Sequence, residues 1–169
     1  PHPDDYVTSL LVHDGKIYVG GYFSSVGGQP RSYVAALDPV SGHATPWNPN
    51  ANGSVLAMAP MGDAVIAVGM FRHIGGQVRT GVAAIDTTTG LATFWNPSAG
   101  GGGDCYAIAT SDSSIYIGGD YLTMGGQPRG SIAAVDPGTG AATSWNPATD
   151  GLVDAIALLD GTIYIGGFF

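Results

Sequence analysis

Residues 33–49 read Tyr-Val-Ala-Ala-Leu-Asp-Pro-Val-Ser-Gly-His-Ala-Thr-Pro-Trp-Asn-Pro, and this stretch decides the fold because the chain contains it three times. It recurs as Gly-Val-Ala-Ala-Ile-Asp-Thr-Thr-Thr-Gly-Leu-Ala-Thr-Phe-Trp-Asn-Pro at 81–97 and as Ser-Ile-Ala-Ala-Val-Asp-Pro-Gly-Thr-Gly-Ala-Ala-Thr-Ser-Trp-Asn-Pro at 131–147. The copies follow one another at steps of 48 and 50 residues. A nearly constant step of this length indicates a tandem array in which each copy is one supersecondary unit.

Each repeat divides into four short apolar runs, which in the first copy are 7–12, 17–23, 33–38 and 44–47. The runs are rich in β-branched and aromatic residues and are bounded by Gly, Asp, Asn and Pro, as is typical of β-strands. Because they are almost continuously apolar, we expect sheets that are covered on both faces. The sequence therefore predicts an all-β chain, a β-propeller made of four-stranded antiparallel blades.

The repeat units are expected at 6–53, 54–103 and 104–151, and 152–169 supplies only the inner half of a fourth blade. We treat 1–169 as a single propeller segment. An open ring would leave a sheet edge and an apolar blade face unpaired. We therefore expect the segment to be part of a longer chain, or else to close its ring with copies of itself.

Composition narrows the class of protein further. All 13 acidic residues are Asp, Lys16 is the single lysine, and the net charge is −8. A nucleic-acid-binding surface needs clustered Lys and Arg, so we expect no nucleic-acid partner. No apolar stretch is long enough for membrane insertion. The single cysteine, Cys105, excludes a disulfide within the chain and is expected to be a small buried apolar residue.

Groupings that carry catalysis or bind metals are absent from the sequence. None of the four histidines recurs across the repeats, and no Gly-x-Ser-x-Gly, His-x-x-x-His or Cys-x-x-Cys pattern occurs. Asp4-Asp5 is the only pair of adjacent carboxylates. We therefore predict no catalytic residue, no metal site and no cofactor, and we expect that the chain is not an enzyme.

Polar side chains that recur in every repeat are the candidate binding residues. Because they occur in loops at one face of the predicted blades, they could recognise a carboxylate, a sugar or a peptide. The alternative is structural, since an Arg that bonds backbone carbonyls and an Asn that caps a turn would recur in the same way. The candidates are Gln29, Arg31, Asn48, Gln77, Arg79, Asn96, Gln127, Arg129 and Asn146.

The recurring tryptophans, Trp47, Trp95 and Trp145, also allow two interpretations. A large aromatic side chain at each repeat is expected to pack one blade on the next. A row of exposed indoles for stacking on sugars is the alternative.

Two parts of the repeat resemble known propeller families. The string from Ala36 to Trp47 resembles the tryptophan-docking repeat of quinoprotein-type (PQQ-like) propellers. The stretches 17–23 and 26–29 resemble the delta-sixty propeller repeats of bacterial surface and secreted proteins. The resemblance covers nearly all of 6–169, and it implies a propeller fold and an extracellular or cell-surface location, with the periplasm as an alternative.

Together these features predict a non-enzymatic binding or scaffold module that recognises protein or glycan on one propeller face, in a lectin-like manner if the ligand is a sugar. The first alternative is the propeller part of a quinoprotein-like enzyme whose catalytic residues lie outside this segment. The second is a structural element of a surface filament or layer.

Overall fold

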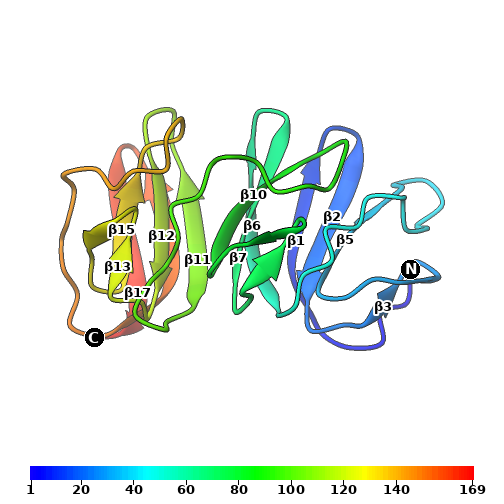
Figure 1. The fold of residues 1–169 in the computed structure, drawn as a ribbon, viewed down its shortest axis with the longest axis horizontal. Coiled ribbons are helices and arrows are strands. Elements are labelled where there is room, and N and C mark those ends of the chain that lie inside the picture. The colour runs from blue at the N-terminus through cyan, green and yellow to red at the C-terminus, as the bar shows by residue number, and fades with distance from the viewer.

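The computed structural model describes residues 1–169, and every regular element in it is a β-strand. Three antiparallel sheets of three strands stand in a row, and a two-stranded sheet packs on the third (Figure 1). The structure contains no helix that could cross a membrane. The sheets are formed by β1 (Val7–His13), β2 (Lys16–Gly21) and β5 (Val34–Leu37); β6 (Val55–Met61), β7 (Ala64–Gly69) and β10 (Val82–Asp86); β11 (Cys105–Thr110), β12 (Ile115–Gly119) and β15 (Ile132–Val135); and β16 (Leu152–Leu159) with β17 (Thr162–Phe168).

The first and second runs of each repeat form a hairpin, as the sequence predicts. In the first sheet the turn consists of Asp14 and Gly15, whose φ angles are 47° and 67°. Two successive positive φ angles define the type I′ turn, which matches the twist of the strands that it joins and favours Asp-Gly. The second run then becomes the middle strand of the sheet, with the third run on its other side.

A short extra hairpin follows the middle strand, where the sequence predicts only a loop. In the three sheets it consists of β3 (Ser25–Val26) and β4 (Gln29–Pro30), β8 (His73–Ile74) and β9 (Gln77–Val78), and β13 (Thr123–Met124) and β14 (Gln127–Pro128). The tip of the first one, Gly27-Gly28, has positive φ at both residues, 61° and 78°. The Gly27 carbonyl accepts the Ala44 N–H at 3.0 Å, so the hairpin folds back onto the fourth run.

The fourth run is shorter than the strand that the sequence predicts. It makes one antiparallel bridge, between Leu37 and Ala44, and one further hydrogen bond from the Thr45 N–H to the Ala36 carbonyl at 2.8 Å. Beyond Thr45 the chain leaves the sheet, because Trp47 packs against the next sheet. Each blade-like unit therefore has three regular strands and an outer edge of bridge length.

Small residues let neighbouring sheets approach closely. Ala35 and Ala36 are fully buried, as the recurring Ala pairs predict. A Cβ added to Gly20 would lie 2.9 Å from the Cγ1 of Val55 on the second sheet, and one added to Gly118 would lie 2.7 Å from the Cγ1 of Val153 on the fourth. The second sheet thus places a valine on a glycine of the first, and the fourth sheet places one on a glycine of the third. The equivalent positions of the second and third sheets hold Val68 and Cys105.

The recurring glycine at the end of the middle strand serves a β-bulge. The register shifts between Val55 and Ala57 opposite Gly69, and a Cβ on Gly69 would lie 2.0 Å from the Ser54 carbonyl oxygen. No side chain fits that space, so only glycine allows the first strand to cross so near.

Candidate functional site

The recurring arginines bond the backbone of their own blade. Arg79 donates from one terminal nitrogen to the Val78 carbonyl at 2.9 Å and from the other to the Thr93 carbonyl at 2.7 Å. Arg31 and Arg129 make the same two bonds to their equivalents. The planar guanidinium therefore ties the small hairpin to the fourth run in every blade. This geometry fits the structural alternative, in which each recurring Arg bonds backbone carbonyls of its own blade.

The recurring Gln and Asn side chains make no hydrogen bond to those arginines. Gln29 is exposed on β4 of the small hairpin. Asn48 lies in the link to the next blade, where its backbone approaches Gly90. Gln77, Asn96, Gln127 and Asn146 are exposed in the same way. No hydrogen bond joins the recurring Gln, Arg and Asn side chains to one another, so the structure does not tie them into one site.

Trp47 and Trp95 point inward and connect consecutive blades, whereas Trp145 is half-buried and its indole N–H makes no hydrogen bond. Trp47 is 4% exposed and its indole N–H donates to the Asp86 carbonyl of the second blade at 2.8 Å. Trp95 is bonded in the same way to the Asp136 carbonyl at 3.1 Å. The Tyr18 ring meets the Trp47 indole edge to face at 5.0 Å. Blade packing is thus the role that the geometry supports, because a buried indole offers no surface to a sugar.

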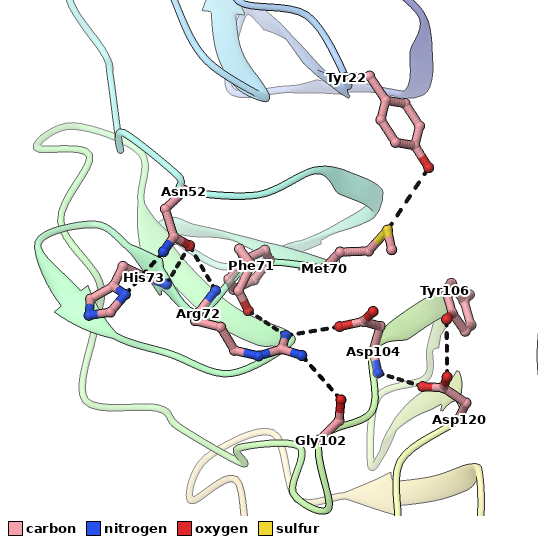
Figure 2. Close-up of polar contacts among 10 residues, drawn as sticks. All are labelled: Tyr22, Asn52, Met70, Phe71, Arg72, His73, Gly102, Asp104, Tyr106 and Asp120. Atoms are coloured by element: carbon pink, nitrogen blue, oxygen red, sulfur yellow. Dashed lines mark hydrogen bonds and ion pairs between the residues drawn. The ribbon is translucent and has the colours of Figure 1, made fainter.

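Residues that differ between the repeats gather at the other end of the strands, where the first run begins and the second run ends. Arg72 occupies a position held by Ser24 in the first repeat and Leu122 in the third. Its guanidinium reaches from the second blade to the third, bonding Asp104 at 2.9 Å and the Gly102 carbonyl at 3.2 Å (Figure 2). Unlike the recurring arginines, Arg72 therefore joins two blades.

Asp104 leads to two further side chains of the third blade. Its N–H donates to the Asp120 carboxylate, which also accepts the Tyr106 hydroxyl at 3.3 Å (Figure 2). Burial, reinforced by Asp120 and Asp104, raises the pKa of Tyr106 to about 12. The phenol is protonated at neutral pH and donates a hydrogen bond to the Asp120 carboxylate.

The position of Asp120 directly follows the middle strand, and its counterparts in the first two blades are Tyr22 and Met70. Their exposed fractions are 43% and 41%, and the Tyr22 hydroxyl lies 4.0 Å from the Met70 sulfur. We call these residues, together with Arg72, Asp104 and Tyr106, the strand-end arc. The sequence contains one signal for it, namely the departure from the repeat at these positions.

Asp4 caps the first small hairpin. Its carboxylate accepts the Ser24 hydroxyl and the N–H groups of Ser24 and Ser25, and these bonds hold its pKa well below the usual range. Asn52 does the same in the second blade, accepting the N–H groups of Arg72 and His73 at 2.8 and 2.9 Å. The Asp4 carboxylate, one of the two in the Asp4-Asp5 pair, therefore holds the first small hairpin in place.

Cys105 is buried at the start of β11, as the sequence predicts. Burial raises the pKa of its thiol far above the ordinary value, and Asp104 and Asp120 add to that effect. A thiol held protonated is a poor nucleophile.

Comparison with known proteins identifies the fold and no activity. A family model described as a β-propeller domain of unknown function, DUF5122, matches residues 13–42. No curated protein sequence matches the chain.

Among solved structures, the computationally designed Ika4 protein matches with a TM-score of 0.64 and 16% identity over 96% of this chain and 86% of its own. The designed Ika8 protein matches with a TM-score of 0.61 and 17% identity over 95% of this chain and 42% of its own. BamB from Moraxella catarrhalis matches with a TM-score of 0.59 and 23% identity over 96% of this chain, which spans 44% of BamB. The predicted fold is therefore confirmed: the chain is a β-propeller segment of three blade-like units followed by one further strand pair.

Proposed function

We propose that this chain is a non-enzymatic binding module of a secreted or cell-surface protein, and that it recognises a protein partner through the strand-end arc. One observation carries the proposal. The recurring Arg side chains and two of the recurring Trp side chains are bonded within the fold. Tyr22, Met70 and Asp120, which break the repeat, are exposed at one end of the strands. A site for a single ligand needs side chains that differ from blade to blade. A structural role that is the same in every blade does not need such differences.

The chemistry of the arc favours a protein over a glycan. Tyr, Met and Arg are enriched in protein interfaces, and Tyr22, Met70 and Arg72 lie on this surface. Tyr22 and Met70 offer apolar area, and Asp120 offers a charged acceptor. Trp47 and Trp95, the side chains best suited to stack on sugars, are buried.

A screen of the purified chain against a phage-displayed random-peptide library and a glycan array tests this function. We expect peptides that bind the unchanged chain and bind at least tenfold more weakly to Tyr22→Ala and Asp120→Ala. Val40→Ala is the matched control, because Val40 is 94% exposed in the turn after β5, at the opposite end of the strands. Peptides that are indifferent to both arc variants, or binding to glycans alone, would contradict the proposal.

A further inference from the structure

The second repeat contains a reactive dipeptide, Asn52-Gly53, in the loop that leads into β6. The backbone nitrogen that follows an asparagine can attack the side-chain amide, and glycine, which has no Cβ, hinders this approach least. The recurring asparagines each precede a proline, whose nitrogen carries no hydrogen and cannot react in this way. Asn50 precedes Ala51, whose Cβ hinders the approach. Asn52 is therefore the asparagine whose sequence most favours loss of its amide.

The bonds around the Asn52 amide assist this attack. Its Oδ1 accepts the backbone N–H groups of Arg72 and His73 at 2.8 and 2.9 Å (Figure 2). Donors aimed at a carbonyl oxygen stabilise the negative charge that develops there when a nucleophile adds to the carbon. The Asn52 side chain is exposed, so water reaches it, and the Gly53 N–H makes no hydrogen bond within the chain. The attacking nitrogen is therefore free, and the carbonyl that it attacks is polarised.

An aspartate at position 52, the product of the reaction, already has a counterpart in the fold. Asp4 holds the equivalent position of the first repeat, and its Oδ1 accepts the N–H groups of Ser24 and Ser25 at 2.8 and 2.9 Å. These are the same two bonds that the Asn52 Oδ1 makes. The Asn52 Nδ2 lies 3.2 Å from the His73 Nδ1, so an oxygen in its place would face a ring nitrogen that can carry a proton. The carboxylate therefore fits the contacts of the amide that it replaces.

We propose that Asn52 is a site of spontaneous deamidation in the folded chain, and that the aspartate formed takes over the cap of the second small hairpin. The Gly53 nitrogen bonds to the Asn52 Cγ and gives up its proton, the Cγ–Nδ2 bond breaks, and ammonia leaves. Water then adds to Cγ and breaks its bond to the Gly53 nitrogen, which restores the peptide bond and leaves a carboxylate. The net reaction consumes one water, releases one ammonia and adds one negative charge beside the backbone of Arg72.

Incubation of the purified folded chain in mildly alkaline buffer tests the site, with peptide mapping by mass spectrometry at successive times. We expect the Asn52 amide to be converted to a carboxyl group, while Asn50, its exposed neighbour, keeps its amide over the same period. Asn52→Gln is the matched control, because glutamine would have to close a larger ring, and it should gain no negative charge on ion exchange. The converted chain should co-elute with Asn52→Asp and have the same urea midpoint.

The same incubation in urea separates the chemistry of the dipeptide from that of the fold. A chain that loses the Asn52 amide only when unfolded would overturn the proposal, because the fold would then protect the amide. Conversion of Asn50 at the same rate would also overturn it. So would isoaspartate as the sole product, which forms when water opens the ring at the main-chain carbonyl carbon and lengthens the backbone. Amide hydrogen exchange at Arg72 and His73 should be no faster after conversion, since bonds to a carboxylate are stronger, and faster exchange at both would refute the new cap.

Discussion

Arg79 and Arg72 lie in the same blade, seven residues apart, but one guanidinium bonds within that blade and the other bonds to the next blade. Arg79 bonds two carbonyls of its own blade, and Arg31 and Arg129 repeat those bonds. Arg72 occurs once and reaches a carboxylate of the next blade. In a repeat array, a side chain that recurs together with its contacts stabilises each repeat unit. A side chain that departs from the repeat marks a feature that one blade has and the others lack.

Among substitutions of the recurring residues, we expect Trp95→Ala to cause the largest loss of stability. The indole is 5% exposed and packs between the second and third sheets, so its removal leaves a cavity. It also removes one of the two hydrogen bonds to the Asp136 carbonyl, which keeps the bond from the Gly140 N–H. We expect the free energy of unfolding to fall by about 3–5 kcal/mol. Urea denaturation followed by circular dichroism measures this loss. Trp95→Phe keeps most of the volume, and a loss as large as that of Ala would contradict a packing role.

The two arginines can be compared directly by removing each one. Arg79→Ala takes donors from two carbonyls beneath the small hairpin, and we expect a loss of about 1–3 kcal/mol of unfolding free energy. Arg72→Ala removes a pair whose arginine side chain is 40% exposed, and we expect a loss of about 0.2–1 kcal/mol, as for surface ion pairs. Urea denaturation at low and high salt distinguishes the two losses of stability, because salt screening should reduce only the loss caused by Arg72→Ala.

Substitution of Arg79 and Arg72 by Lys tests whether each arginine acts through its planar shape or through its charge. Arg79→Lys should recover little stability, because one ammonium group cannot replace a planar fork that bonds two carbonyls at once. Arg72→Lys should recover most of the charge attraction to Asp104. The opposite order would mean that Arg79 acts mainly through its charge.

Much of the fold could be predicted because the turn and strand preferences of single residues indicate the same elements as the repeat. Asp14-Gly15 predicts a type I′ hairpin since both residues tolerate positive φ, and the recurring Trp47 predicts blade packing. The small hairpin over 25–30 could not be predicted in this way, because each of its strands is two residues long and shows no alternation. Its stability comes from the fourth run and from Arg31, which are contacts across the blade.

The candidate site was harder to predict for a related reason. Recurrence in every repeat points to Arg31, Arg79 and Arg129, and the guanidinium of each of these bonds the backbone of its own blade. Arg72 and Asp104 come from different repeats and have no common spacing, so only the packing of two blades brings them together. The one signal in the sequence is that both residues depart from their counterparts, Ser24 and Leu122 for Arg72 and Tyr6 and Ser54 for Asp104.

The smallest expected effect comes from the recurring Asp turns, and it depends on pH. The Asp86 carboxylate accepts the N–H groups of Thr88 and Thr89 and the Thr89 hydroxyl, and these bonds lower the pKa of Asp86. Because the folded pKa lies below that of the unfolded chain, the turn stabilises the fold fully above about pH 4. That contribution is lost as the pH falls through the lowered folded pKa.

Asp86→Asn keeps an acceptor oxygen but cannot titrate, so it isolates this contribution. At pH 7 we expect a slightly lower urea midpoint than in the unchanged chain, because neutral bonds are weaker than charge-assisted ones. Between pH 4 and pH 2 the difference should shrink and vanish. The equivalent bonds of Asp38 and Asp136 persist in the variant, so the remaining pH dependence should be flatter but present. A difference that stays constant over this range would mean that the Asp86 turn carries no charge-dependent stability.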